Sequence, residues 1–406
     1  MGWFGKKKPE NFFIPFGMGS SGSIFNREDP IRVFSDVSLI SAIVGTRSQT
    51  FADARPYITT KKDGIGDDAI STQAKDLNRI FERANFYMSF SEWYVQKEII
   101  KMLFGYCITY LVRATPASPI AAMFNLLPSQ VSFSWKGKML HQRSLSECVT
   151  VKIQGVNTTI NPDKDIIIWN DRAVGLDTGN SILSLPRISS VLRDADLSRY
   201  ISEAEHTLVT KRGAIGIMSM DPEGASQGIF DAEKEVLQDS LKEHGLSAKQ
   251  SQIFFTNLPL RWHPVTWNAK DLMLREIDEA VAKRVCGVFD VPYYLLPMSG
   301  QSTYDNVKQS EVQLYERVSL PTSRGDAATF ARAFGLPENE FVYFDYSHVH
   351  VLAENMKEKS ETLNTMAGAL ATLLSNNIIT YTEARVEASR YMDIEPKKPD
   401  NTITNG

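Results

Sequence analysis

The stretch that decides the fold runs from Asn268 to Pro321 and reads NAKDLMLREIDEAVAKRVCGVFDVPYYLLPMSGQSTYDNVKQSEVQLYERVSLP. Residues recur at three- and four-residue spacing over Asn268–Phe289, which is typical of an amphipathic helix. The members of this stripe are Leu272, Ile277, Ala280, Val281, Arg284, Val285 and Val288. Asp271 is an acid in the first turn, where it complements the helix dipole. We therefore expect one strong helix, ended by Pro292.

A polar loop and a second helix follow this break. The segment Met298–Thr303 carries small polar side chains, one glycine and no large apolar anchor. A helical stripe then resumes and runs to Pro321; it consists of Val307, Glu311, Leu314, Tyr315 and Val318. The sequence therefore predicts two helices that hold a mobile polar loop between them.

This arrangement resembles part of the portal proteins of tailed bacteriophages, of the siphovirus type. The residues that carry the resemblance are Val288–Pro292, Leu295-Leu296, Asn306, Gln309, Leu314-Tyr315 and Leu320-Pro321. Each of these short segments is common at the ends of helices in general. The resemblance therefore lies in the order and spacing of the segments. It implies an α+β portal fold with a mixed α/β wing, a two-helix stem, a small α/β clip, a tunnel loop and a C-terminal helical crown.

Length and composition agree with a multi-lobed globular protein. The chain has 406 residues, of which 43% are hydrophobic and 23% charged. This length exceeds the size at which one core usually keeps growing, so two or more lobes are expected. A net charge of −4 argues against a protein whose whole surface grips nucleic acid. Cys107, Cys148 and Cys286 lack metal-type spacing, so reduced thiols are expected.

The N-terminal segment contains no apolar run long enough for a signal peptide, and no window approaches a membrane span of about 18 residues. We expect a soluble protein without a membrane partner. Residues 1–28 predict a flexible N-terminal arm whose aromatic side chains dock on a neighbour. Gly17–Gly22 matches GxGxxG, but this motif indicates dinucleotide binding only between a strand and a helix. Asn26, Asp29 and Pro30 disfavour such a helix here.

Residues 29–184 predict a mixed α/β wing. We expect helices over Arg32–Val44, Ser71–Arg83 and Ser91–Phe104, and strands over Pro56–Thr60, Tyr106–Arg113, Phe124–Trp135, Cys148–Ile153 and Asp165–Trp169. Gly105–Tyr110 and Leu126–Val131 also resemble strands of the portal wing. Any mixed α/β core would contain similar strands, so the expected role of this region is structural.

Two long helices are expected to flank a compact insert. Residues 185–211 predict the first stem helix, with Ser184 as N-cap, and residues 268–290 predict the second. Residues 212–267 between them predict a clip with a strand at Ala214–Met218, a helix at Asp231–Glu243 and a strand at Gln252–Phe255. The alternative to a portal clip is an independent α/β subdomain carried on a helical hairpin.

The resemblance implies that the stem lies beside DNA and that the clip docks first the large terminase and later the head-completion adaptor. The clip residues assigned to docking are Ile215, Ile217, Phe254 and Phe255. A protein that grips duplex DNA clusters Lys and Arg on one face. The predicted stem helices mix acidic and basic residues instead, which suits passage of DNA; for any one residue, a solvated or intersubunit pair is the simpler interpretation.

Residues 291–305 match the tunnel loop region, the narrowest part of the channel in this family. Small hydroxyl and amide side chains there can meet phosphates without reading bases. The predicted channel residues are Ser299, Gln301, Ser302 and Thr303.

The remaining regions complete the predicted organisation. Residues 306–346 predict a wing helix and strand, residues 347–395 the crown helices, and residues 396–406 a disordered tail. The crown stripe comprises Met356, Leu363, Met366, Leu370 and Leu373. His348 and His350 have no Cys or carboxylate in matching register, so no metal is expected.

No catalytic signature is present: Walker A, GxSxG, HExxH and paired CxxC motifs are absent from the sequence. We therefore expect no enzyme activity and no cofactor. The resemblance implies a virion protein that is assembled in the bacterial cytoplasm as a ring of twelve copies. Such a ring conducts double-stranded DNA and contacts the major capsid or scaffold protein. The alternative is a phage-encoded enzyme or nucleotide-binding protein that uses the Gly-rich N-terminal segment.

Overall fold

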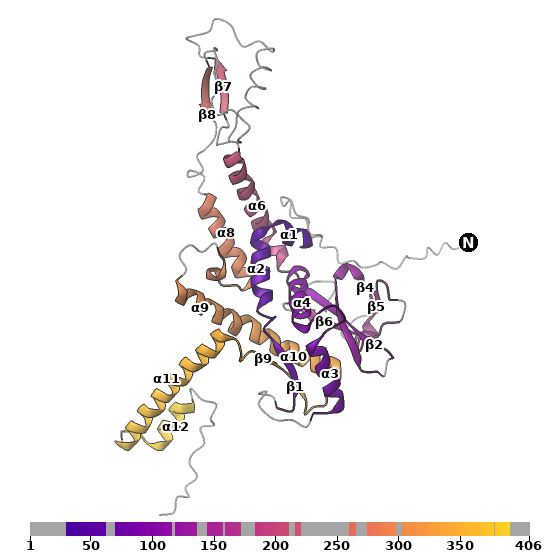
Figure 1. Ribbon diagram of the computed structural model, residues 1–406, viewed down its shortest axis with the longest axis vertical. Coiled ribbons are helices and arrows are strands. Elements are labelled where there is room, and N and C mark those ends of the chain that lie inside the picture. Colours follow the sequence, from indigo (N-terminus) through magenta and orange to yellow (C-terminus); the bar gives the residue numbers. More distant parts are fainter. Residues whose placement is uncertain are drawn as a thin grey trace, which may run out of the picture. The chain divides into compact units, whose positions relative to one another are not determined.

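The computed structural model describes residues 30–61, 70–115, 118–135, 144–156, 159–171, 183–210, 216–220, 260–264, 274–297, 303–376 and 378–389 (Figure 1). The chain divides into two compact units. The first comprises Met1–Thr46, Ile100–Tyr106 and Asn170–Met298, and the second comprises Arg47–Ile99, Cys107–Trp169 and Ser299–Gly406. Both contain helices and strands, so the α+β class expected from the sequence is correct.

The first unit is mainly helical. Its elements are α1 (Pro30–Asp36), the first part of α2 (Ser38–Gln49), the end of α4 (Phe90–Phe104), α6 (Ile188–Thr210), β7 (Gly216–Met220), β8 (Leu260–Pro264), α8 (Leu274–Phe289) and the short 3-10 turn η3 (Tyr293–Leu295). The single helix expected over Arg32–Val44 is two helices, because the chain leaves helical conformation at Val37.

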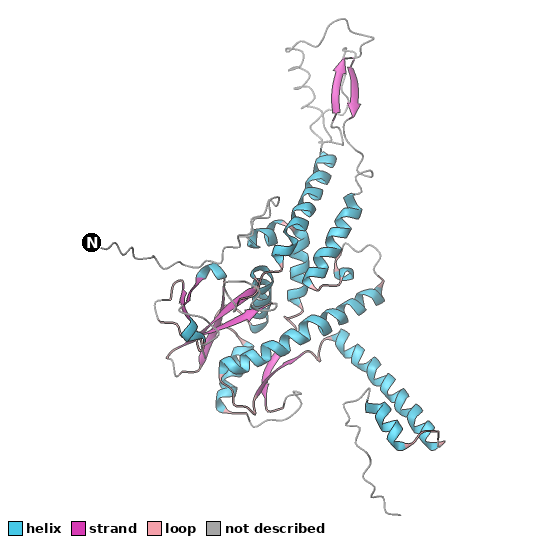
Figure 2. Ribbon diagram, turned by 180° about the vertical axis from the view of Figure 1, so that it is seen from behind, coloured by secondary structure: helices cyan, strands magenta, loops and turns pink. Residues whose placement is uncertain are grey.

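The second unit combines strands with a long helical segment (Figure 2). Its strands are β1 (Arg55–Thr59), β2 (Tyr106–Arg113), β3 (Ile120–Leu126), β4 (Val131–Trp135), β5 (Val149–Ile153), β6 (Ile166–Asn170) and β9 (Phe341–Asp345). Its helical elements include α3 (Thr72–Glu82), η1 (Pro128–Gln130), α5 (Leu145–Cys148), α9 (Tyr304–Leu314), η4 (Tyr315–Ser319), α10 (Leu320–Phe334), α11 (His350–Ser375) and α12 (Tyr381–Ser389).

The strands form several small sheets. β1 pairs antiparallel with β9, so that Arg55 lies opposite Asp345 and Thr59 opposite Phe341. β2 lies between β3 and β6, β4 pairs antiparallel with β5, and β7 pairs antiparallel with β8. The prediction of one strand over Phe124–Trp135 was wrong. Pro128 begins a 3-10 turn there, and the two halves join different sheets.

Gly105 ends α4 and its place could not be filled by another residue. Its φ is +84°, and a Cβ atom would lie 2.4 Å from the carbonyl oxygen of Ser184. The hydroxyl of Ser184 donates a hydrogen bond to the Gly105 carbonyl oxygen. The prediction of Ser184 as the N-cap of the following helix was therefore wrong. The Ser184 side chain bonds to Gly105, and α6 begins only at Ile188.

The helix after the predicted loop does not end at Pro321. Between α9 and α10 the chain forms one π-helical segment, in which the Leu320 amide donates to the Tyr315 carbonyl. Pro321 then lies in the first turn of α10, where its missing N–H is tolerated. Buried hydrogen bonds hold this segment, from Tyr315 to Asp53 and between Ser319 and Thr50 at 2.7 Å.

Aromatic residues fill the core of the second unit. The Phe330 ring of α10 lies with its centroid 4.8 Å from that of Trp169 and 5.2 Å from that of Phe334. The Tyr94 ring stacks at 5.4 Å on Phe344 of β9. Such contacts between α4, β6, α10 and β9 unite segments that are far apart in the sequence, and aromatic pairs contribute stability beyond their buried area.

A buried cation lies inside this aromatic core. Lys97 is fully buried on α4, and its ammonium group donates to Asp326 of α10 and lies 2.9 Å from Glu98 Oε1. Its Nζ is also 4.2 Å from the ring centroid of Tyr94 and 4.5 Å from that of Trp169. Burial, followed by the nearby charge of Asp326, raises the pKa of the Tyr94 hydroxyl well above its usual value. The hydrogen-bonded charges thus join α4 to α10.

The C-terminal helices α11 and α12 bury few of their described apolar side chains. Among the side chains described in α11, the predicted stripe is only partly buried, and Met356 is 65% exposed. Thr380 and Glu383 form a reciprocal capping box at the start of α12, with the Thr380 amide donating to Glu383 and the Glu383 amide donating to Thr380 Oγ1. No helix in the described part of the chain is long and apolar enough to cross a membrane.

The buried ion pair leads to a stability prediction. Replacing Lys97→Met leaves the carboxylates of Glu98 and Asp326 buried without their cation, so the free energy of unfolding should fall by about 3–5 kcal/mol. Chemical denaturation followed by tryptophan fluorescence measures this loss. Lys75→Met, at an exposed position of α3, is the control and should change stability by less than about 0.5 kcal/mol. Equal effects of the two changes would contradict the role assigned to Lys97.

Candidate functional site

The candidate site is built on two helices, α6 and α8, that lie side by side in both views (Figures 1 and 2). Arg284 Nη2 of α8 is 2.6 Å from Asp194 Oδ1 of α6, and Ser198 Oγ of α6 donates to Asp278 Oδ1 at 3.3 Å. From Asp194 to Ser198 the residue numbers on α6 rise, while those of their partners on α8 fall from Arg284 to Asp278. The two helices are therefore antiparallel. At 1.5 Å per residue, α6 is roughly 35 Å long.

The buried face of the pair differs in part from the predicted stripe. On α8 the buried side chains are Val281, Ala282, Val285, Cys286 and Phe289. Ile277 and Ala280, which were expected on that face, are exposed. The buried face is therefore rotated relative to the predicted stripe. Burial raises the pKa of the Cys286 thiol to about 12. The predicted helix residues 268–273 lie outside the described residues.

On α6, Val191, Leu192, Ala195 and Ile201 are buried as expected. Leu197 and Tyr200 are 37% and 50% exposed, although the sequence placed them in the same stripe. Their spacing of three residues puts both on one face of α6. This isolated chain therefore leaves apolar area uncovered on the paired helices.

Arg187 joins the beginning of α6 to the end of α8. Its Nη2 donates to Asp171 Oδ1 at 3.1 Å, its Nη1 donates to the Val288 carbonyl at 2.9 Å, and a further ion pair joins it to Asp290. Burial opposes the guanidinium charge, but hydrogen bonds and charges from Asp171 and Asp290 outweigh it and raise the pKa of Arg187. Two carboxylates and one carbonyl from different segments thus converge on one cation.

Asp290 reaches Arg187 because α8 ends in a left-handed turn. Its φ is +56°, a conformation that asparagine, aspartate and glycine adopt more readily than other residues. The Val291 amide then donates to the Cys286 carbonyl at 3.0 Å, which is the six-to-one bond of a Schellman motif. Pro292 follows and begins η3 as its N-cap. The Val291-Pro292 break expected from the sequence is therefore present at the end of α8.

Several charged side chains on the paired helices form ion pairs. Lys283 lies 2.7 Å from Glu279, and Arg199 lies 2.9 Å from Glu203, each pair one turn apart on its own helix. The hydrogen bond that Lys283 donates to Glu279 is the main cause of the raised pKa of Lys283. Burial raises the pKa of the Asp278 carboxyl. Acidic and basic groups thus alternate along the pair, as the sequence indicated.

Most of the residues predicted to act directly on DNA or partners lie outside the described residues. These are Ser299, Gln301 and Ser302 of the tunnel loop, and Ile215, Phe254 and Phe255 of the clip. Thr303 is described: it is the exposed N-cap of α9, and its hydroxyl accepts a hydrogen bond from the Asn306 amide at 3.4 Å. Ile217 lies in β7, opposite His263 of β8.

The strand that pairs with β7 was not predicted. β8 begins at Leu260, whereas the sequence favoured Gln252–Phe255, a segment outside the described residues, as is the predicted clip helix Asp231–Glu243. The sequence did not predict the roles of Arg187 and Asp290. A charged residue beside a helix end does not show, from its neighbours in sequence, which distant segment it will contact. Among the described residues no group of three or more His, Cys, Asp or Glu could hold a metal ion.

The three-way contact of Arg187 supports a second prediction. Arg187→Ala should lower the free energy of unfolding by about 3–5 kcal/mol, because Asp171 stays buried without a cation. Urea titration followed by circular dichroism measures the change. Arg193→Ala removes an exposed arginine from the same helix and should cost less than about 0.5 kcal/mol. An unchanged midpoint in Arg187→Ala would show that the contact does not hold these segments together.

Known proteins share both the fold and parts of the sequence. The neck structure of a native gene transfer agent particle superposes with a TM-score of 0.57 at 16% identity, covering 91% of this chain and 96% of that one. A crystal structure of an HK97-family phage portal protein from Corynebacterium diphtheriae gives a TM-score of 0.50 at 10% identity, covering 80% and 96%. At these identities the likeness concerns the fold.

Sequence relatives match over shorter stretches. A protein of Rickettsia bellii described as uncharacterized is 24% identical over 191 residues, 47% of each chain. A second, from Rickettsia felis, is 26% identical over 126 residues, 31% of each chain. The chain thus spans less than half the length of these curated relatives. The family model described as phage portal protein matches residues 40–387, which is most of the sequence. The chain belongs to the phage portal protein family.

Proposed function

We propose that this chain forms a ring at one vertex of a phage-type capsid, through which double-stranded DNA passes during packaging and ejection. Membership of the portal family supports this proposal. The similar neck structure was described with C12 symmetry, which supports a ring of twelve copies here. The chain would then act as the head-tail connector of a virion assembled in the bacterial cytoplasm, with a structural rather than an enzymatic role.

The observation that carries the proposal is the antiparallel pair of α6 and α8, whose acidic and basic side chains pair with one another. Arg284 is held by Asp194, and Lys283 by Glu279. Tight binding of a duplex depends on many Lys and Arg side chains that are free to neutralise phosphates. A wall in which several cations are already paired with carboxylates retains DNA more weakly, and weak retention is what a conduit requires.

The chain order around this pair supports an assignment of regions. We assign residues 185–211 and 268–290 to the stem, 212–267 to the clip, 291–305 to the tunnel loop region and 347–395 to the crown. The wing comprises residues 29–184 and 306–346. Residues 1–28 are assigned to an N-terminal arm and 396–406 to a tail.

The clip would dock the large terminase during packaging and the head-completion adaptor afterwards, through Ile215, Ile217, Phe254 and Phe255. Contact with the major capsid or scaffold protein would come from the wing. The antiparallel pairing of β7 with β8 supports a separate module between the stem helices. In the tunnel loop, Ser299, Gln301, Ser302 and Thr303 would meet the phosphates of passing DNA.

Ring formation gives the first test. Leu197 and Tyr200 are exposed on one face of α6, so a neighbouring copy would cover them in the ring. The double change Leu197→Glu and Tyr200→Glu should abolish rings in negative-stain electron microscopy while the circular dichroism spectrum stays unchanged. Glu205→Lys, an exposed charge change on the same helix, is the control. A wild-type chain that gives only monomers, without a channel, would refute the proposed function.

A change in the proposed channel tests DNA conduction. Gln301→Lys places one added cation per copy in the loop, so DNA should be retained more strongly and packaging should slow. The measurement is the amount of nuclease-protected DNA per particle over time, at two salt concentrations. Lys308→Gln removes a cation from α9 outside the loop and serves as the control. Identical packaging by Gln301→Lys and wild type would argue against a narrow channel at this loop.

The alternative function, nucleotide binding by Gly17–Gly22, concerns residues outside those described. Saturable binding of a nucleotide that disappears on deletion of residues 1–28 would favour it. The same preparation viewed by electron microscopy distinguishes the two, because a portal forms rings without nucleotide.

A further inference from the structure

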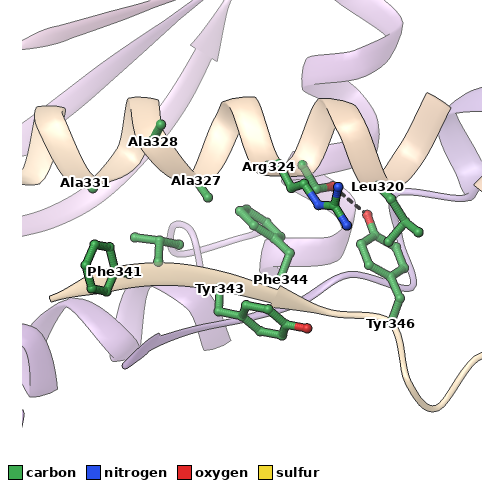
Figure 3. Close-up of a pocket in the computed structure, with 11 residues that line it drawn as sticks. Leu320, Arg324, Ala327, Ala328, Ala331, Phe341, Tyr343, Phe344 and Tyr346 are labelled. Atoms are coloured by element: carbon green, nitrogen blue, oxygen red, sulfur yellow. Dashed lines mark hydrogen bonds between the residues drawn. The ribbon is translucent and has the colours of Figure 1, made fainter. Parts of the chain in front are cut away.

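A groove of about 510 Å³ lies between α10 and β9, within the second unit (Figure 3). Small side chains of α10 form one wall: Ala327 and Ala331 lie on the side of the helix that faces the strand. Aromatic side chains of β9, including Phe341, Tyr343 and Phe344, also line the groove; Phe344 points toward α10, and Tyr343 points to the other side of the strand (Figure 3). Consecutive residues of a strand point to opposite faces, yet residues 341–344 all line the groove. The groove therefore follows the edge of β9.

That edge has no strand partner within the part of the chain that the structure describes. β9 pairs with β1 along one side, and this sheet contains only these two strands. An unpaired strand edge presents backbone N–H and C=O groups that a further strand can use. An apolar groove beside such an edge fits an extended peptide, since backbone hydrogen bonds supply affinity and side-chain pockets supply specificity.

The two ends of the groove differ in polarity. Phe341 and Ala331 lie near one end, and Arg324 and Tyr346 lie at the other (Figure 3). Arg324 is exposed, and no ion pair to it occurs among the described residues. Beside it, the buried hydroxyls of Ser323 and Tyr346 bond to each other at 2.7 Å. The best occupant therefore has an apolar body with an acidic residue at one end.

The N-terminal sequence contains a segment with this chemistry, Glu10-Asn-Phe-Phe-Ile-Pro-Phe16. In an extended conformation Phe12, Ile14 and Phe16 share one face, and their amides share one edge. Pro15 has no backbone N–H, but its nitrogen lies on the opposite edge of the extended segment. No hydrogen bond to β9 is therefore lost. We propose that residues 11–16 of a second copy of this chain add to the free edge of β9 as an antiparallel strand, with Glu10 beside Arg324.

The antiparallel direction follows from the charges. Arg324 and Tyr346 mark the C-terminal end of β9, so Glu10 must lie at that end and Phe16 near Phe341. Residues 17–29 separate Phe16 from the first described helix, and an extended chain of this length reaches roughly 45 Å. This reach suits a neighbouring copy. The choice of a second copy rests on the proposed ring, whereas the groove and its chemistry do not.

A binding experiment tests the chemistry of the groove. A fluorescein-labelled peptide of residues 9–17 is titrated with the chain that lacks residues 2–16, and fluorescence anisotropy is recorded. Saturable binding is expected. A peptide with Phe12→Ser, Ile14→Ser and Phe16→Ser should not bind, whereas Phe13→Ser should bind nearly as well as the parent. Equal binding of all three peptides, or none by the parent peptide, would overturn the proposal.

Two charge reversals on α10 supply a matched pair for the same titration. Arg324→Glu should weaken the peptide roughly fivefold, as expected for an exposed ion pair that becomes a repulsion. Arg332→Glu changes an exposed arginine of the same helix that does not line the groove, and should leave the affinity unchanged. Equal weakening by both would indicate general electrostatic attraction and would overturn the groove assignment.

Photo-crosslinking in the full-length chain tests orientation and the source of the segment. Benzoylphenylalanine in place of Phe16 should attach near Phe341 and Ala331, and in place of Phe12 near Phe344 and Arg324. When ¹⁵N-labelled and unlabelled chains are mixed before assembly, some crosslinked products should join a labelled peptide to an unlabelled one. Crosslinks only within one isotope would assign the segment to its own chain and overturn the second-copy proposal. Rings without any crosslink to residues 320–346 would overturn this inference and leave the proposed function intact.

Discussion

The contact of Arg187 with Asp171, Asp290 and the Val288 carbonyl is the interaction on which the candidate stem depends. It fixes the first residues of α6 against the last residues of α8, where the two helices enter and leave the rest of their unit. The guanidinium and the Asp171 carboxylate are buried, whereas Asp290 is half exposed, and removing one partner of a buried pair is strongly destabilising. The left-handed turn at Asp290 and the Schellman bond of Val291 belong to the same arrangement, since they bring the carboxylate to the guanidinium.

A comparable constraint organises the second unit, where Lys97 lies between Tyr94, Trp169 and the carboxylate of Asp326. The aromatic rings around it hold α4, β6, α10 and β9 together, and the hydroxyls of Ser323 and Tyr346 extend the hydrogen-bond network to the groove beside β9. The π-helical segment lets α9 and α10 continue through Pro321, and it is held by side chains near the end of α2. A single long helical segment thus joins the predicted tunnel loop to the aromatic core.

The proposed role as a conduit is compatible with the ordinary composition of the chain. Three basic side chains of α6 and α8, those of Arg199, Lys283 and Arg284, are paired with carboxylates. Exposed apolar side chains of the described residues include Leu197 and Tyr200 on α6, and one edge of β9 has no strand partner among those residues. Both are surfaces that association between copies would cover.

The sequence by itself determined most helices and strands, because periodic apolar residues, Gly105 and Pro292 act through local backbone geometry. It also indicated the portal fold, through the order of those elements. Only the tertiary structure decided that Ser184 bonds Gly105 instead of capping a helix, that β7 pairs with Leu260–Pro264, and that Arg187 and Lys97 are buried. These features depend on contacts between residues far apart in the chain, and side-chain charge alone does not show which distant group will neutralise it.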